Sequence, residues 1–161
     1  MAKPVKTNAM RQLERMGIEY RSISYDVADG AIDGLAVAKK TGQPPERVYK
    51  TLVGQGASGG VFVFCIPVAD ELDLKQAARA AGEKSLALVP VAQINALTGY
   101  LRGGVSPLAM KKAWPVFLWA PAMAHPTIVV SGGRAGLQME LAPQDLATAA
   151  GAQLFGQENT N

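Results

Sequence analysis

The feature that most constrains the fold is an almost continuous apolar run at residues 61–66, which reads Val-Phe-Val-Phe-Cys-Ile. A run of this length, rich in β-branched and aromatic side chains, is typical of a central strand that is covered on both faces. A Gly/Ser-rich stretch at residues 54–60 precedes it and predicts a hairpin-like return from a strand at residues 47–53. We therefore expect a sheet with other elements packed on both sides.

Strands and helices are mixed along the rest of the chain without regular βαβ alternation. Apolar spacing and end signals predict helices at residues 7–16, 33–40, 73–81, 90–97 and 143–150. Further strands are predicted at residues 18–25, 86–89, 116–119, 127–130 and 137–141, with a turn at Gly132-Gly133 and a loose tail from 153. This order favours an α+β fold with a mixed, largely antiparallel sheet.

Length and composition predict one globular domain over residues 1–161. Charged residues make up 18% and hydrophobic residues 48% of the chain, which excludes a disordered protein. The longest apolar stretch is too short to span a bilayer, and the first residues lack the apolar core of a signal peptide. A single cysteine excludes an internal disulfide, so we expect a reduced, cytoplasmic setting without a membrane partner.

Most common catalytic motifs are absent from the sequence. There is no P-loop and no G-x-G-x-x-G, and one cysteine with one histidine cannot form a common zinc site, so neither cofactor nor metal is expected. Ser106 lies in a near miss of a nucleophile elbow, because Leu108 stands where glycine is required. Cys65 lies inside the apolar run and is interpreted as a core residue rather than a nucleophile.

Lys50 is the most unusual polar residue of a predicted strand. Side chains alternate along a strand, so Lys50 shares a face with Val48 and Leu52, which are apolar. A lysine on an apolar face needs a partner, a ligand or a lowered pKa, unless the strand lies at an edge and the side chain extends into water. Glycines at three loops, Gly99, Gly103-Gly104 and Gly132-Gly133, would let backbone groups approach a ligand. Together with Lys50 they predict a pocket.

The net charge of +3 permits a polyanionic partner without requiring one. Two basic pairs, Lys39-Lys40 and Lys111-Lys112, are separated by a long interval. They form one phosphate-binding patch only if the fold brings them together, and the alternative is two solvated surface pairs.

Four motifs occur in a fixed order: VYKTL at 48–52, PVA with LDLK at 67–75, TGYLxGGxSPL at 98–108 and VSGGRxGL at 130–137, where x is a variable position. In this order they resemble the YbaK/EbsC family of free-standing aminoacyl-tRNA deacylases, most of all its YbaK branch, the Cys-tRNA(Pro) deacylases. The resemblance covers nearly the whole chain. It implies a fold like the editing domain inserted in bacterial prolyl-tRNA synthetases, with a mixed sheet partly curled into a barrel and flanked by helices.

The resemblance also implies an activity and its residues. A wrongly attached amino acid is removed from tRNA, with Cys-tRNA(Pro) as substrate, prolyl-tRNA synthetase as a docking partner and no role for DNA. The family's key lysine and tyrosine correspond to Lys50 and Tyr25, and its Gly-Gly pair, expected to offer N–H groups to the oxyanion, to Gly103-Gly104. Substrate contacts are further expected from Ser106, Ser131, Gly132 and Gln138, and tRNA contacts from Lys39, Lys40, Lys111 and Lys112. The attacking thiol is the substrate's own.

One position departs from the family pattern, because Gln138 stands where an aspartate is usual. An amide can form hydrogen bonds but carries no charge, so amino-acid preference is open at this point. Two alternatives to a Cys-tRNA(Pro) deacylase therefore remain: a deacylase for another small amino acid such as alanine, and a non-catalytic module that binds an aminoacyl or nucleotide ligand.

Overall fold

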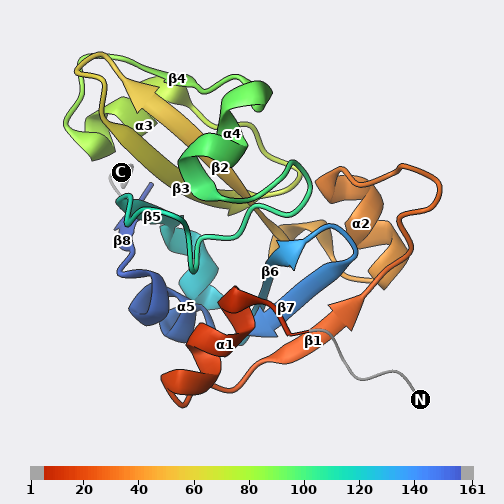
Figure 1. The fold of residues 1–161 in the computed structure, drawn as a ribbon. Coiled ribbons are helices and arrows are strands. Elements are labelled where there is room, and N and C mark those ends of the chain that lie inside the picture. The colour runs from red at the N-terminus through yellow and green to blue at the C-terminus, as the bar shows by residue number, and fades with distance from the viewer. Residues whose placement is uncertain (1–5, 157–161) are drawn as a thin grey trace.

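A computed structural model describes residues 6–156, in which two sheets pack against each other and helices surround them (Figure 1). The three-stranded sheet has the order β1 (Arg21–Ser24), β7 (Leu137–Leu141), β6 (Ile128–Arg134). The five-stranded sheet has the order β4 (Leu86–Leu88), β2 (Tyr49–Gly56), β3 (Val61–Pro67), β5 (Val116–Trp119), β8 (Gln153–Phe155). The helices are α1 (Asn8–Arg15), α2 (Gly34–Thr41), α3 (Leu74–Ala81), α4 (Val91–Thr98) and α5 (Pro143–Ala150), with 3-10 turns at Pro45–Arg47 and Ala120–Ala124.

The strand pairing is mixed and largely antiparallel, as predicted. The β1–β7, β6–β7, β2–β3 and β2–β4 pairs are antiparallel, whereas β5 runs parallel to both β3 and β8. The expected partial barrel is not found, because the strands form two separate open sheets rather than one curled sheet. An isolated parallel bridge between Val48 and Val129 joins the start of β2 to β6.

The apolar run at residues 61–66 is the central strand β3, with β2 on one side and β5 on the other. One face of the β2–β3 pair packs toward the three-stranded sheet, where Val63 and Cys65 are buried with residues of α1 and α5. The other face carries Phe64 and Ile66, which pack against Ala77 and Ala78 of α3. Coverage on both faces explains why the run contains no polar residue.

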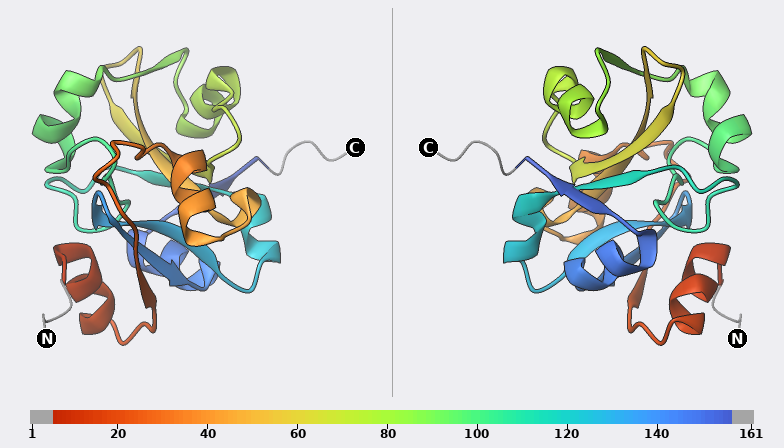
Figure 2. Two further views of the ribbon diagram at one scale, coloured as in Figure 1. Left: turned by 90° about the vertical axis from the view of Figure 1, so that its right-hand side faces the viewer. Right: turned by 90° about the vertical axis from the view of Figure 1, so that its left-hand side faces the viewer.

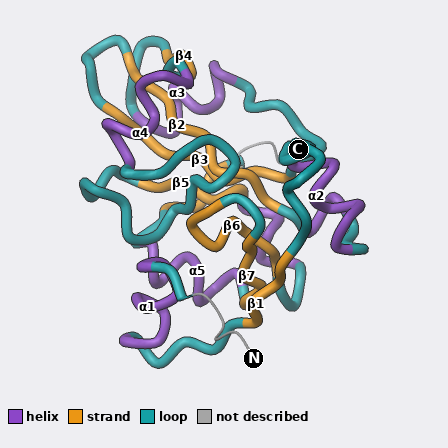
Figure 3. The backbone as a smooth tube through the Cα atoms, turned by 45° about the vertical axis from the view of Figure 1, so that its right-hand side comes forward, coloured by secondary structure: helices purple, strands orange, loops and turns teal. Residues whose placement is uncertain are grey.

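The helices begin and end at the residues that the sequence indicates. Asp33 and Asp73 accept hydrogen bonds from backbone N–H groups in the first turns of α2 and α3. Gly42 and Gly82 end the same helices in the left-handed conformation. Figures 2 and 3 show the strands in the middle, with α3 and α4 at one end of the molecule and α1 and α5 at the other. No helix in the described range is long and apolar enough to cross a membrane.

Two predictions about the C-terminal third were wrong. Gly132-Gly133 does not form a turn, because both lie within β6 at a β-bulge, where Gly133 has a φ of 105°. The turn lies three residues later, at Ala135-Gly136. Residues 153–155 are not a loose tail, since β8 pairs with β5 and Phe155 is buried against Phe64 and Trp119. Residues 157–161 of the predicted tail lie outside the described residues.

Candidate functional site

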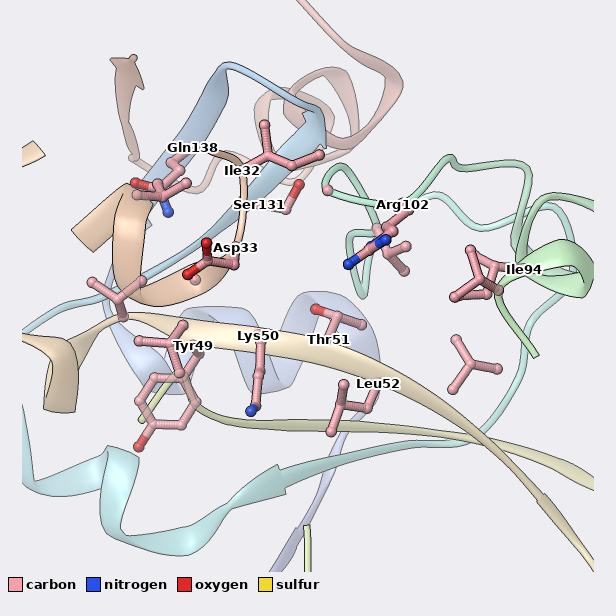
Figure 4. Close-up of a pocket in the computed structure, with 18 of the residues that line it drawn as sticks. Ile32, Asp33, Tyr49, Lys50, Thr51, Leu52, Ile94, Arg102, Ser131 and Gln138 are labelled. Atoms are coloured by element: carbon pink, nitrogen blue, oxygen red, sulfur yellow. The ribbon is translucent and has the colours of Figure 1, made fainter. Parts of the chain in front are cut away.

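A cavity of about 320 Å³ lies along one edge of β2 (Figure 4). β4 pairs with β2 only from Gly54 onward, so in the described part of the chain the first half of β2 has no strand beside it on this edge, apart from the bridge at Val48. Carbonyl and N–H groups alternate in direction along a strand, and the Val53 carbonyl points to this edge because it accepts from Val89 N–H at 3.0 Å. The N–H and C=O of Thr51 therefore face the cavity.

The cavity is a trough with two chemically different ends. We call one end the polar end, which is formed by Asp33, Ser131 and Gln138 (Figure 4). The opposite end, the apolar end, is formed by Leu88 and by Val91 and Ile94 of α4. Leu88 and Val91 are exposed large hydrophobic side chains, so this end offers an apolar surface to a ligand.

Local structure fixes the three side chains of the polar end. Ser131 and Gln138 are directly opposite each other in the β6–β7 ladder, so they share one face of the three-stranded sheet. The Ser131 hydroxyl accepts a hydrogen bond from Gly133 N–H at 3.1 Å, within the bulge. Asp33 lies at the rim of the trough as the N-cap of α2, where its Oδ1 accepts from Ala36 N–H at 3.0 Å.

Gln138 is the buried polar group of this end, with 6% of its surface exposed. No described residue donates a hydrogen bond to its Oε1. An acceptor that is buried without a partner costs free energy, typically about 1–3 kcal/mol. A ligand in the trough that donates to this oxygen, once the amide has made a half turn, would remove that cost.

Lys50 lines the trough and is half-buried. It lies opposite Ile66 of β3 and shares its face with Leu52, so the predicted apolar face is confirmed. In Figure 4 the Lys50 side chain lies on one side of the β2 ribbon. Asp33, Ser131 and Gln138, which belong to other elements, lie on the opposite side. Among residues 6–156 no hydrogen bond or ion pair holds the Lys50 ammonium, which is therefore free to rotate about its side-chain torsions.

Of the other residues expected at the site, Tyr25 and Gly103 line the trough. Gly103 has a φ of 86°, and a Cβ there would lie 2.8 Å from Ile32 Cδ1, which also lines the trough. A larger residue would thus be strained and would push into the wall of the cavity. Gly103 therefore shapes the site through its backbone.

Gly104, Ser106 and Gly132 lie outside the trough lining. Gly104 N–H already donates to the Leu101 carbonyl at 2.9 Å, so it is not available to an oxyanion, contrary to expectation. A Cβ on Gly104 would lie 2.6 Å from Arg134 Cα, which shows that this glycine is required by the close approach of two loops.

Ser106 and Gly132 have structural partners instead. Ser106 is fully buried, and its hydroxyl accepts from Leu108 N–H at 3.2 Å. The Gly132 carbonyl accepts from the Thr7 hydroxyl at 2.5 Å, which ties β6 to the N-cap of α1.

The four lysines expected to bind tRNA are not equivalent. The Lys40 ammonium is 2.7 Å from Asp29 Oδ1 and also donates to two carbonyls of the loop before α2, so it holds that loop. Lys112 lies over the Trp114 ring at 5.5 Å from its centroid. Lys39 and Lys111 are exposed. The structure thus leaves three of the four free to meet a phosphate.

Two residues of the trough were not expected from the sequence analysis. From the sequence, Asp33 was placed only at the start of a predicted helix, and Arg102 only at the variable position of the TGYLxGG motif. Arg102 is exposed beside Gly103, and in the described range no hydrogen bond or ion pair holds its guanidinium (Figure 4). The sequence feature that could have pointed to Arg102 is its position as a cation within a glycine-containing loop.

Two further observations concern the chemistry available to the site. Burial raises the pKa of the Cys65 thiol to about 12, so it remains protonated and a poor nucleophile at neutral pH. No group of three or more His, Cys, Asp or Glu side chains within residues 6–156 is arranged to hold a metal ion.

Comparisons with known proteins converge on one family. A sequence profile described as aminoacyl-tRNA editing domain matches residues 33–149. A protein of Enterococcus faecalis with the provisional name Cys-tRNA(Pro)/Cys-tRNA(Cys) deacylase EbsC is 38% identical over 92% of this chain and 90% of its own length.

Solved structures share the fold. A crystal structure described as a candidate trans-editing enzyme for prolyl tRNA synthetase superposes with a TM-score of 0.78 at 23% identity, over 93% of this chain and 96% of that one. A hypothetical protein superposes with a TM-score of 0.81 at 24% identity, over 89% of this chain and 94% of that one.

Proposed function

Because the chain belongs to the aminoacyl-tRNA editing-domain family and is an aminoacyl-tRNA deacylase, we propose that its substrate is Cys-tRNA(Pro) and that the substrate's own thiol attacks the ester. The two-ended trough beside β2 is the observation that carries this proposal. An aminoacyl ester of a terminal adenosine also has two ends, one small and polar, the other flat and largely apolar.

The substrate would lie along the edge of β2. The aminoacyl group occupies the polar end, near Ser131 and Gln138. The terminal adenosine occupies the apolar end, where aliphatic side chains of α4 contact the base and Arg102 meets the base or the adjacent phosphate. Thr51 offers its backbone N–H and C=O between the two ends, where the ribose and the ester would be.

The proposed reaction needs no nucleophile from the protein. The thiolate of the substrate cysteine attacks its own carbonyl carbon, the C–O bond to the ribose breaks, and the ribose oxygen takes up a proton. A small cyclic thiolactone leaves, together with free tRNA. This agrees with the position of Cys65, the chain's one cysteine, which is buried and protonated and lies outside the trough.

The chain's residues would position the ester and stabilise charge. Gly103 is the remaining member of the Gly-Gly pair that could offer its N–H to the oxyanion, since Gly104 N–H is already used. The Lys50 ammonium would rotate toward the trough and bind the ribose or phosphate oxygens of the substrate. Tyr25 would close the polar end beside Gln138.

The test is single-turnover deacylation of Cys-, Ser- and Ala-tRNA(Pro) at equal concentration. Serine is nearly isosteric with cysteine, so a pocket that selects only by size would treat the two alike. Attack by the substrate thiol predicts rapid loss of Cys only, because a hydroxyl is a far weaker nucleophile at neutral pH. Equal deacylation rates for Cys-tRNA and Ser-tRNA would refute this mechanism. Faster deacylation of Ala-tRNA than of Cys-tRNA would show that the substrate is a different aminoacyl-tRNA.

The same assay distinguishes a deacylase from a binding module and shows whether a synthetase is needed. A non-catalytic binding module would retain the mischarged tRNA without releasing any amino acid. A requirement for a synthetase would appear as a rate that rises when prolyl-tRNA synthetase is added, and an unchanged rate would show that the deacylase acts without it.

A further inference from the structure

The polar end of the trough has two side chains that each carry an oxygen acceptor without a described partner. Gln138 Oε1 is buried and receives no hydrogen bond from any described residue. Asp33 uses its Oδ1 to cap α2, and within the described range no hydrogen bond reaches its other carboxylate oxygen. Both side chains line the same cavity and lie on the same side of β2 (Figure 4).

Unused acceptors of this kind point to a ligand with several donors. The aminoacyl end of the proposed substrate has one such group, the α-ammonium, which carries three N–H donors and a positive charge. A neutral amide can satisfy one donor but cannot balance the charge. Some carboxylate must do so, or the ammonium loses its hydration without compensation.

We propose, on the basis of the function above, that Asp33 is the counter-ion of the substrate's α-ammonium and that Gln138 is its neutral partner. Asp33 is the one acidic side chain among the described residues that line the trough. Its Oδ1 is held by the Ala36 N–H, so the carboxylate has a fixed position at the rim of the trough. A half turn of the Gln138 amide would direct its Oε1 toward the same donor group.

With Asp33 as the counter-ion, a neutral amide at position 138 is compatible with binding of the positively charged α-ammonium. A buried carboxylate there would need its own compensation, whereas an exposed carboxylate on the rim of the trough is solvated until the substrate covers it. The charge is thus supplied from a helix cap instead of from the floor of the cavity. Selectivity for an aminoacyl over a neutral acyl group follows from Asp33.

The test compares two substrates and three proteins. The substrates are Cys-tRNA(Pro) and the isosteric ester in which a hydroxyl group replaces the α-ammonium. The proteins are the wild type, Asp33→Asn, and Asp73→Asn as a matched control. Asparagine also caps a helix well, so Asp33→Asn removes the charge and retains the cap. Asp73 caps α3 in the same way but lies outside the trough.

Asp33→Asn should raise the half-saturating concentration for the ammonium substrate about 10-fold and leave that for the hydroxyl substrate unchanged. Asp73→Asn should change neither. Equal effects of Asp33→Asn on both substrates, or no effect on either, would overturn the role of Asp33 while the wild type still deacylates. A wild type that releases nothing from Cys-tRNA(Pro) would instead refute the proposed function.

Discussion

Lys50 and Asp33 place opposite charges along the first half of β2, and they differ in how their charged groups are held. Asp33 is fixed by the cap that it forms, whereas the Lys50 ammonium has no partner in the described part of the chain. A fixed anion suits recognition of a small ammonium group. A mobile cation suits larger anionic groups whose positions change during a reaction.

Lys50→Ala should reduce single-turnover deacylation about 100-fold or more while the free energy of unfolding changes by less than about 1 kcal/mol. Lys50 is half-buried without a partner among the described residues, so its removal leaves no unpaired group behind. Lys84→Ala is the control, because Lys84 is exposed and lies outside the trough. Near wild-type turnover in Lys50→Ala would show that the lysine does not take part in the reaction.

Cys65→Ala should retain deacylation at pH 7. Burial raises the pKa of the Cys65 thiol to about 12, and this side chain faces the core between the sheets. The same rate across about pH 6–9, relative to wild type, is expected because the thiol stays protonated throughout that range. Cys65→Ser should be less stable by about 1–3 kcal/mol, since it buries a hydroxyl. A folded but inactive Cys65→Ala would indicate a protein nucleophile.

Among the elements, β1 and β7 are joined to the turn before β2 by one carboxylate. Glu140 of β7 accepts from Arg21 of β1, from Arg47 at 2.8 Å and from the Thr127 hydroxyl at 2.6 Å. The hydrogen bond from Thr127 lowers the pKa of Glu140, with those from Arg21 and Arg47 adding to the effect. This network aligns the three-stranded sheet with β2, and the trough lies between them.

Glu140→Gln should lower the free energy of unfolding by about 1–3 kcal/mol at pH 7, as measured by urea denaturation. A lowered folded-state pKa contributes stability that is present above the unfolded value and is lost as pH falls through the folded value. The difference between wild type and Glu140→Gln should therefore shrink as pH falls below 4.5, the ordinary pKa of a glutamate. Glu19→Gln, on the exposed surface, is the control and should change the free energy of unfolding at pH 7 by less than about 0.5 kcal/mol.

The sequence predicts most elements because their signals are local. Asp33 and Gly42 delimit α2 by capping chemistry, and the run at residues 61–66 indicates a covered strand by composition alone. β8 was missed because its three residues carry no strand pattern and are held by pairing with β5, a non-local contact. The bulge in β6 was misread as a turn, since glycines serve both structures.

At the scale of the whole molecule, the site depends on contacts that no local pattern shows. The motifs indicate Lys50 and Gly103, but the trough exists because two sheets leave the edge of β2 open between them. Asp33 and Arg102 line it from segments far apart in the sequence, and their place in the trough is visible only in three dimensions. Conversely, Ser106 and Gly132 belong to recognised motifs and serve packing.

Binding of tRNA should be weak and moderately salt-sensitive. The net charge is only +3, and Lys40 is already paired with Asp29, so few cations remain for phosphates. Each phosphate contact contributes about 0.7–0.9 to the slope of log K against log salt. The double variant Lys111→Ala/Lys112→Ala should weaken binding of every tRNA alike and reduce that slope by about 1–2.

The variant Arg102→Ala distinguishes a contact of Arg102 with a tRNA phosphate from a contact with the terminal base. If Arg102 binds the phosphate next to the terminal adenosine, the variant should reduce the salt slope by about 0.7, the value for one single-strand contact. If it stacks on the base instead, affinity should fall without a change in slope, because stacking releases no counterion. If Arg102→Ala binds tRNA with wild-type affinity at both low and high salt, the terminal nucleoside does not bind at the apolar end of the trough.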